Sequence, residues 1–389
     1  MKKILVCPDS FKGSLTSEEA IEAISSGLRE AGFKGDIDTC EMSDGGEGFD
    51  KIIQSHENVK KVEVKTVDAL HRPIVAEYLL DSGQKFAYIE SARSIGIEKL
   101  TVEEKNPLAT SSIGLGLMIT DAVKKDVNEI YISLGGSATV DGGMGMMTAL
   151  GIEFKDHNGN ILLSNGHSLN MIADIMADKI DNDLTKLKFH AVCDVENPLL
   201  GKSGAVNIFA VQKGAGLRDL PYLEKGMKNL SEVLIKKGLA RESDINNKGA
   251  GAAGGLGFAL QTVFHADYIS GIDFIKNLMK FSKKVSGSDL IITGEGCVDA
   301  QSLMGKVLSG ILEEASKYDV PVVSFCGKVK NKTILLKNNL KEIIEISDPH
   351  LSDKENMEKP VAFRHLKNAV KKYYNSLSEE NSEQPAPRG

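Results

Sequence analysis

The chain has 389 residues, of which 41% are hydrophobic and 26% are charged, and its formal net charge is −7. This composition is typical of a globular protein with substantial cores, and the length favours two or three domains. The acidic balance, without any block of lysine and arginine, argues against nucleic acid or an anionic membrane surface as a partner.

The five cysteines are scattered along the chain and include no CxxC pair. An odd number at such spacing fits neither a disulfide framework nor a zinc site, which favours a reduced compartment. The apolar run at the start stops at Pro8, too early for a signal peptide, and we expect no segment that spans a bilayer. The sequence therefore predicts a cytoplasmic protein.

Short apolar runs alternate with helical patterns from the start of the chain. Residues 2–7 and 36–42 are predicted strands, and between them a capping box of Thr16 and Glu19 begins a helix that ends near Gly32. Residues 49–56 form the next predicted helix. Further strands are expected at 128–134, 187–195, 288–293, 320–326 and 342–347. This alternation predicts an α/β fold with a parallel sheet.

The pattern changes near residue 70, where the alternating stretches RPIVAEYLL and QKFAYIE indicate antiparallel strands. We therefore expect two α/β domains, a parallel Rossmann-like sheet domain and a second, mixed α/β domain inserted in it. The first domain would comprise residues 1–70 and 286–375, and the inserted domain residues 71–285. Residues 376–389 are polar and contain proline, so we expect a disordered tail.

Loops rich in glycine follow most of the predicted strands. Parallel sheets bind ligands at the carboxyl ends of their strands, and unpaired N–H groups at the following helix starts favour anions. Tight turns also use Gly and Asp, so one such loop alone would indicate only a turn. The chain has six: DSFKGS, SDGGEG, GGSATVDGGMG, CDVENPLLGKSGA, GAGAAGGLG and GEGCVDAQS. Their number favours a binding function.

The same loops carry carboxylates, two lysines (Lys12 and Lys306) and several hydroxyls. Mg²⁺ prefers one or two carboxylates together with phosphate oxygens, so this mixture indicates phosphoryl transfer. No Walker motif, strand-following G-x-G-x-x-G or G-x-S-x-G occurs, which weakens dinucleotide and hydrolase interpretations. The carboxylates are Asp9, Asp44, Glu47, Asp141, Asp194, Glu295 and Asp299.

Seven strings resemble, in order, the bacterial glycerate kinase family from residue 1 to about 370. They are PDSFKGSLTSEEA, MSDGGEG, GGSATVDGGMGMMTALG, CDVENPLLG, QKGA, GAGAAGGLG and GEGCVDAQSLMGK. The chain departs from the family at Val140, where Asn is usual, and at Cys297, where Arg is usual. The resemblance implies two α/β domains with the active site in the cleft between them. It also implies ATP-dependent phosphorylation of D-glycerate, on the 2-hydroxyl to give 2-phosphoglycerate.

On this basis each loop receives a candidate role. Asp194, Asp44 and Lys12 are the candidate catalytic residues, and Asp194 and Asp299 are the candidate ligands of Mg²⁺. Glycerate would be bound by Asp9, Ser10, Lys12, Asp44 and Glu47. The phosphates of ATP would be bound by Gly135, Gly136, Ser137, Thr139, Gly251, Gly254, Gly255, Glu295 and Lys306.

Three alternatives to this function stay open. The kinase could act on the 3-hydroxyl, or on a related small hydroxy acid such as tartronate or glycolate. The protein could also be a non-catalytic sensor of phosphorylated metabolites. Asp194 itself could be a turn-forming residue, since Asp often caps loops. The oligomeric state does not follow from the sequence.

Overall fold

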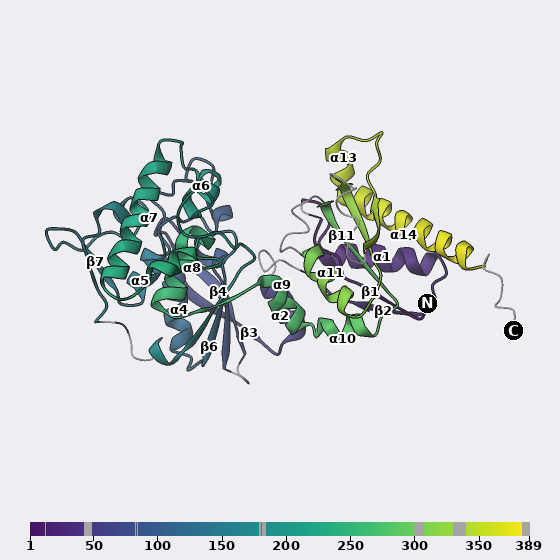
Figure 1. Cartoon of the computed structure of the whole chain (residues 1–389), viewed down its shortest axis with the longest axis horizontal. Coiled ribbons are helices and arrows are strands. Elements are labelled where there is room, and N and C mark those ends of the chain that lie inside the picture. The colour runs from purple at the N-terminus through teal and green to yellow at the C-terminus, as the bar shows by residue number, and fades with distance from the viewer. Residues whose placement is uncertain are drawn as a thin grey trace. The chain divides into compact units, whose positions relative to one another are not determined.

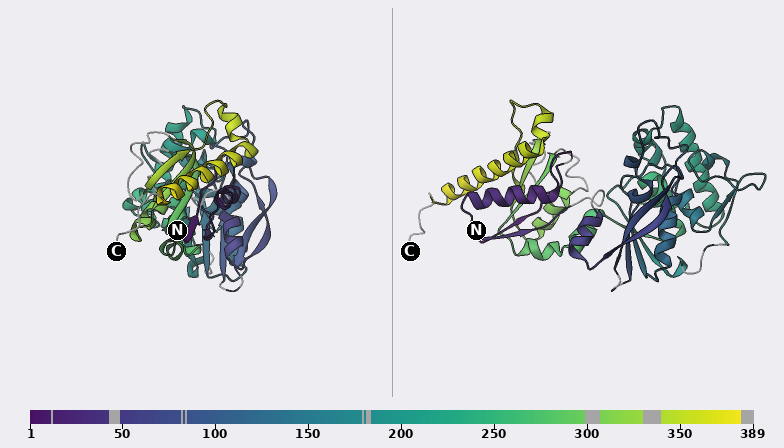
Figure 2. Two further views of the ribbon diagram at one scale, coloured as in Figure 1. Left: turned by 90° about the vertical axis from the view of Figure 1, so that its right-hand side faces the viewer. Right: turned by 180° about the vertical axis from the view of Figure 1, so that it is seen from behind.

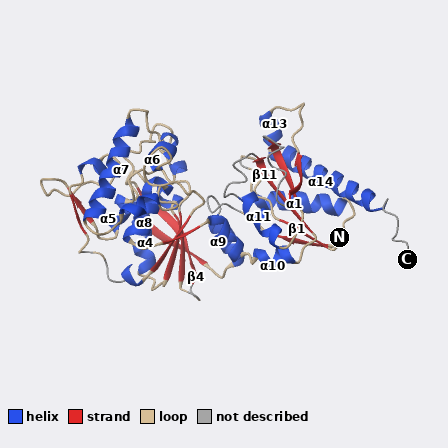
Figure 3. Ribbon diagram, viewed as in Figure 1, coloured by secondary structure: helices blue, strands red, loops and turns tan. Residues whose placement is uncertain are grey.

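The computed structural model describes residues 1–11, 13–42, 49–81, 83, 85–178, 180, 184–298, 307–329 and 340–382. The chain divides into two compact units (Figure 1). Unit 1 comprises Met1–Asp44 and Ile275–Gly389, and unit 2 comprises Gly45–Phe274. Both units contain helices and strands in alternation, which confirms the predicted α/β class (Figure 3).

Unit 1 is built on a five-stranded sheet in the order β13-β12-β11-β1-β2, in which all neighbours are parallel. Its strands are β1 (Lys3–Val6), β2 (Asp36–Thr39), β11 (Leu290–Val298), β12 (Val322–Val329) and β13 (Leu340–Glu345). Its helices are α1 (Ser17–Glu30), α10 (Phe281–Ser286), α11 (Val307–Lys317), α13 (Asp353–Met357) and α14 (Lys359–Ser382).

The start of α1 follows from its sequence. Thr16 Oγ1 accepts from the Glu19 N–H at 3.1 Å, and the Glu19 carboxylate accepts from the Thr16 N–H at 2.8 Å, so the predicted capping box is confirmed. The buried face of α1 packs against α14, and the two helices lie together in both views of Figure 2. Their apolar residues join β1, β11 and β12 in one core.

Unit 2 contains a six-stranded sheet in the order β10-β9-β6-β5-β4-β3. Its first four strands are mutually parallel, whereas β4 is antiparallel to both β3 and β5, as the alternating stretches predict. The strands are β3 (Lys60–Val67), β4 (Pro73–Asp81), β5 (Phe86–Glu90), β6 (Glu129–Ser133), β9 (Lys188–Val192) and β10 (Asp267–Ile269). A separate pair is β7 (Glu153–Lys155) and β8 (Asp174–Met176).

The helices of unit 2 are α2 (Phe49–His56), α3 (Ala92–Ile95), α4 (Ile113–Val123), α5 (Met144–Ala149), α6 (Ala205–Phe209), α7 (Asp219–Lys236) and α8 (Ala252–Val263). Helix α9 (Gly271–Leu278) contains the second division between the units. Short 3₁₀ helices are η1 (Ile97–Lys99), η2 (Ser168–Met171), η3 (Leu184–Lys186), η4 (Val211–Lys213) and η5 (Glu242–Asn246).

The two faces of this sheet differ in composition because strand side chains alternate between them. One face contributes Ile89, Ile132 and Ala191 to the large core shared with α4, α5 and α8. The other face carries Tyr131, whose ring stacks on that of His190 with centroids 4.2 Å apart. Rings from α2 and α9 pack on this second face, so both faces of the sheet are covered.

Several expected boundaries differ from the structure. The breaks expected near residues 70 and 285 lie at 44/45 and 274/275, because residues 68–72 only turn the chain from β3 into β4. Strand β11 does not stop at 293 but runs to Val298, since Cys297 and Val298 pair with β12. Residues 376–382, expected in a disordered tail, belong to α14, where Leu377 packs into the core.

Candidate active site

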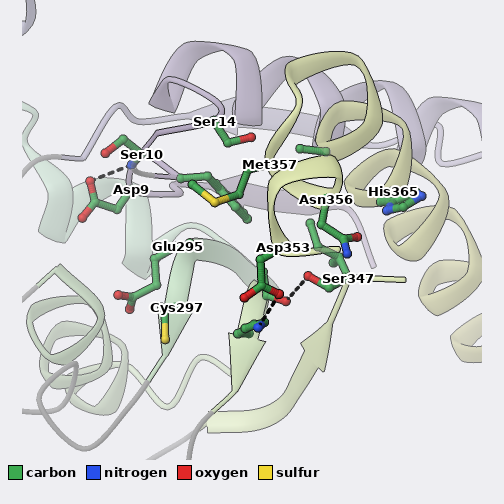
Figure 4. Close-up of a pocket in the computed structure, with 16 residues that line it drawn as sticks. Asp9, Ser10, Ser14, Glu295, Cys297, Ser347, Asp353, Asn356, Met357 and His365 are labelled. Atoms are coloured by element: carbon green, nitrogen blue, oxygen red, sulfur yellow. Dashed lines mark hydrogen bonds and ion pairs between the residues drawn. The ribbon is translucent and has the colours of Figure 1, made fainter. Parts of the chain in front are cut away.

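Unit 1 has a cavity of about 330 Å³ at the carboxyl ends of its strands (Figure 4). The chain proceeds outward from β1 to β2 on one side and from β11 through β12 to β13 on the other. The order of the strands therefore reverses between β1 and β11, which is where open α/β sheets bind ligands. Asp9 and Ser10 follow β1, and Glu295 lies on β11; all three line this cavity.

The turn after β1 is fixed by backbone bonds that continue the sheet. The Asp9 N–H donates to the Gly294 carbonyl at 2.9 Å, and the Asp9 carboxylate accepts from the Ser10 N–H at 2.6 Å. Gly294 must lack a side chain, because a Cβ there would lie 2.3 Å from the Phe325 carbonyl oxygen. The turn after β1 and the adjacent strand β11 thus both reach the cavity, which brings Asp9, Ser10 and Glu295 together. The sequence assigned Asp9 and Ser10 to glycerate and Glu295 to the nucleotide phosphates, and these roles stay predictions.

The opposite wall of the cavity comes from β12 and the helices that follow β13. Lys328 Nζ forms an ion pair with Asp353 at 2.6 Å, and this partner raises the pKa of Lys328. Met357 and Ala362 supply apolar surface together with Phe11 from the turn after β1. Cys297 is exposed and lies near Glu295 on β11 (Figure 4). The cavity therefore combines carboxylates at one end with an apolar wall, which suits a small polar molecule with hydroxyl groups.

Five of the predicted site residues cannot be placed. Lys12, Asp44, Glu47, Asp299 and Lys306 lie outside the described residues.

In unit 2 the glycine loop 135–143, which follows β6, contacts the segment 249–257 at the start of α8. The Gly142 N–H donates to the Gly254 carbonyl at 3.0 Å. Ala253, Gly254 and Gly255 have φ of 50°, 70° and 93°, a left-handed turn inside what is otherwise a helix. A Cβ at Gly254 would lie 2.0 Å from the Thr139 carbonyl oxygen. The two segments predicted to bind phosphate therefore pack directly on each other.

The glycine loop is held around a buried carboxylate, Asp141. Its oxygens accept from the Ser112 N–H and hydroxyl, both at 2.7 Å, and from the Gly143 and Gly145 N–H groups, both at 3.1 Å. Burial raises the pKa of Asp141, whereas these hydrogen bonds act to lower it. The hydrogen bonds of the buried Asp141 carboxylate thus fix the conformation of the loop.

Lys213, which the sequence analysis did not single out, lies beneath the same loop. Its Nζ donates to Ser137 Oγ and to the Thr139 carbonyl oxygen, both at 2.9 Å. Burial lowers the pKa of Lys213 to about 7, and the Asp141 carboxylate acts against this shift. The only trace of this residue in the sequence is the QKGA string, since a lone lysine gives no periodic pattern.

Asp194 follows β9 and lies at the start of α9. Its Oδ1 accepts from Ser270 Oγ at 2.8 Å and from the Ile272 N–H at 3.3 Å. This is the geometry of a side chain that caps a helix, and a carboxylate there also interacts favourably with the helix dipole. These contacts give Asp194 the structural role of a helix cap, and its catalytic role stays a prediction.

The side chains of the described residues can be compared with the ligands that Mg²⁺ prefers. Within the described ranges, no three His, Cys, Asp or Glu side chains gather into a group that could hold a metal ion. Mg²⁺ in phosphoryl-transfer sites usually takes only one or two carboxylates and completes its shell with phosphate oxygens and water. A half-buried carboxylate at a strand end, such as Asp194, therefore fits this ion.

The comparisons with known proteins agree over the whole chain. The family model described as "Glycerate kinase family" matches residues 4–377. The chain belongs to the glycerate kinase family. A glycerate kinase of Bacillus subtilis is 36% identical over 84% of this chain and 85% of its own length. A glycerate 2-kinase of Escherichia coli is 37% identical over 84% of this chain and 85% of its own length.

A crystal structure from Salmonella typhimurium LT2, assigned to glycerate kinase 2, has a TM-score of 0.82 at 30% identity. The match covers 98% of this chain and 99% of the chain in that structure. As a member of the glycerate kinase family, the chain is an enzyme that phosphorylates glycerate and uses a nucleotide substrate. In the part of the chain that the structure describes, no helix has the length and apolar character needed to cross a membrane.

Proposed function

We propose that this glycerate kinase transfers the γ-phosphoryl group of ATP to the 2-hydroxyl of D-glycerate in the presence of Mg²⁺. The observation that carries the proposal is the cavity of unit 1, which gathers Asp9, Ser10 and Glu295 at the strand-order reversal of a parallel sheet. Its volume lies at the small end of the ~300–1,000 Å³ typical of ligand sites, which suits a small organic acid. The 37% identity to a glycerate 2-kinase supports the 2-position.

Glycerate offers hydroxyl groups as donors and a carboxylate as acceptor. Asp9 and Ser10 can accept hydrogen bonds from its hydroxyls, and the proposal extends to Asp44 and Glu47. Its carboxylate needs a positive group, and we assign Lys12 to it, because Lys328 is already paired with Asp353 in the cavity. Binding the carboxylate equally in the ground and transition states would lower the KM for glycerate without raising kcat.

The glycine loop 135–143 and the turn at 251–255 are the proposed partners of the nucleotide phosphates. Gly136 is exposed and has φ of 63°, so its backbone can approach an anion without interference from a side chain. Ser137, Thr139 and the glycines at 135, 251, 254 and 255 complete this group, together with Glu295 and Lys306. The close packing of Gly254 on Thr139 supports treating these segments as one element.

Asp194 and Asp299 are the proposed holders of Mg²⁺, and Asp194, with Asp44 as the alternative, is the proposed acceptor of the hydroxyl proton. When bound, the ion would neutralise the charge of the phosphate oxygens. Asp194 is half-buried and anchored through Oδ1, so its carboxylate has a fixed position and need not be ordered during turnover.

The proposal is tested by measuring ATP consumption with D-glycerate, L-glycerate, tartronate and glycolate, with and without Mg²⁺. We expect turnover only when D-glycerate and Mg²⁺ are both present, and ³¹P NMR of the product should show phosphate on the secondary carbon. Exclusive formation of 3-phosphoglycerate would overturn the position. Binding of phosphorylated metabolites without any turnover would instead favour the sensor interpretation.

A further inference from the structure

The buried amine of Lys213 forms two hydrogen bonds with the glycine loop 135–143. Lys213 lies at the end of η4 and is 4% exposed. Its two hydrogen bonds, to Ser137 Oγ and the Thr139 carbonyl oxygen, join it to positions 76 and 74 residues earlier in the chain. Gly214, next to it, has φ of 96°, and a Cβ there would lie 2.0 Å from the Lys105 carbonyl oxygen. The chain next to Lys213 therefore packs closely against the backbone of residue 105.

The loop still has unused hydrogen-bonding capacity. Thr139 Oγ1 is buried and has no partner among the described residues. Ser137 Oγ accepts from Lys213, so the hydrogen of its hydroxyl remains available to an acceptor. A buried hydroxyl without a partner is costly, and such groups call for an explanation, commonly a ligand or an ordered water.

Among the residues that the structure describes, the Asp141 carboxylate of the same loop is the ionisable group that favours the charged form of Lys213. Asp141 already accepts four hydrogen bonds from Ser112, Gly143 and Gly145. Its negative charge is therefore shared with those donors, and Lys213 can respond to a second anion brought to the loop.

We propose that Lys213 is a positioning residue for the nucleotide. It fixes the glycine loop 135–143 and takes up a proton when phosphate groups bind to that loop. The inference rests on the proposed function, in which this loop binds the nucleotide phosphates. An anion near the amine stabilises its charged form, so the pKa of Lys213 rises from about 7 on binding and a proton enters from solvent. A lysine that serves only as internal packing would bind no additional proton.

The first measurement is steady-state kinetics of Lys213→Met, with Lys225→Met as the control because Lys225 is exposed on α7. Loss of hydrogen bonds from a charged donor should raise the KM for ATP roughly ten- to a hundredfold. The KM for glycerate should stay unchanged, as should both constants in Lys225→Met. Equal increases in both KM values, or no increase in either, would overturn the proposal.

The second measurement is the number of protons taken up when MgADP binds at pH 7.5, obtained by calorimetry in buffers of different ionisation enthalpy. Proton uptake should be larger in the wild type and Lys225→Met than in Lys213→Met. The same uptake in all three would overturn the proposal. This comparison removes the protons exchanged by the nucleotide itself, since they are common to all three proteins.

Ser137→Ala keeps the lysine and covers the case in which Lys213→Met does not fold. It should raise the KM for ATP and leave the KM for glycerate unchanged, and an unaltered KM for ATP would contradict the proposal. If the wild type does not phosphorylate glycerate at all, the proposed function fails. If the wild type turns over and the lysine variant matches it in every respect, only the inference about Lys213 fails.

Discussion

The two units place glycine and acidic residues at the carboxyl ends of parallel strands, but with opposite results. In unit 1 these residues line an open cavity, where Asp9 follows β1 and Glu295 lies on the adjacent strand β11. In unit 2 the glycine loop 135–143 encloses the buried Asp141 and packs against α8. The cavity of unit 1 therefore exposes side chains, whereas the glycine loop of unit 2 exposes a closely packed backbone.

The comparison shows that a glycine-rich string does not by itself indicate how a loop binds. Gly294 in unit 1 lets neighbouring strands approach below the cavity, while the cavity itself is lined by side chains. Gly254 in unit 2 lets one loop pack on another with no space between them. Substitutions at the cavity of unit 1 should therefore change mainly kinetic constants, whereas those in the glycine loop of unit 2 should also change stability.

Asp194 is the strongest test of this division, because it lies in unit 2 and yet has a proposed catalytic role. In Asp194→Asn the amide oxygen can still accept from Ser270 and Ile272, so the cap at α9 is retained while the charge is lost. We expect kcat to fall by a factor on the order of 10²–10⁴ with little change in KM. A near-normal kcat with a lowered melting temperature would make the residue structural.

Gly254→Ala tests the packing of the glycine loop. The new Cβ would meet the Thr139 carbonyl at 2.0 Å, and φ is 70°. We expect a loss of more than about 3 kcal/mol in the stability of unit 2, from strain and overpacking together. Gly238→Ala is the matched control, since its φ is 73° but nothing lies within 4 Å. Equal losses of hydrogen-exchange protection in β6 in the two variants would show that the contact with Thr139 is unimportant.

In unit 1 the capping box offers a smaller effect away from the cavity. Thr16→Ala removes the acceptor for the Glu19 N–H and should cost about 1 kcal/mol of stability, leaving the kinetic constants unchanged. Thr16→Ser keeps the oxygen and should retain most of the stability. The readout is the denaturant midpoint of unit 1. A change in the KM for glycerate would mean that α1 controls the cavity.

The smallest expected effect concerns Cys297. It is the exposed cysteine, whereas Cys7, Cys40, Cys193 and Cys326 are buried, and burial raises the pKa of Cys40 and Cys193 to about 12. Iodoacetamide should therefore modify Cys297 alone in the native protein, as measured by mass spectrometry. Cys297→Ser should keep most of the activity. A large loss in that variant would reveal a role for the thiol.

Most of the parallel strands were predictable because buried parallel strands are short apolar runs, and all seven predicted runs overlap a strand of the structure. Their ends were less predictable. Cys297 and Val298 join β11 because β12 lies beside them, which local sequence cannot reveal. Likewise, α14 continues to Ser382 because Leu377 finds a core formed by distant residues.

The candidate site was predictable from the sequence to a similar extent. The position of Asp9 and Glu295 in one cavity follows from the pairing of β1 and β11, since Asp9 follows β1 and Glu295 lies in the carboxyl-terminal half of β11. The partnership of Lys213 with Ser137 depends on a tertiary contact between residues 76 apart, for which spacing gives no indication. Roles for Asp194 and the glycine loop remain predictions, which the variants above address.

The pairing of β1 with β11 also determines the order in which the chain can fold during its synthesis. Thr293 Oγ1 donates to the Cys7 carbonyl across 286 residues, so β1 emerges from the ribosome long before its neighbour exists. Unit 2 is continuous in sequence and can be completed first, while β1 and β2 wait as a two-stranded sheet that is not stable alone. During that interval the exposed edge of β1 can pair with other nascent chains. Slow translation between unit 2 and β11 should therefore increase aggregation, and chaperones should engage the N-terminal segment until β11 has been made.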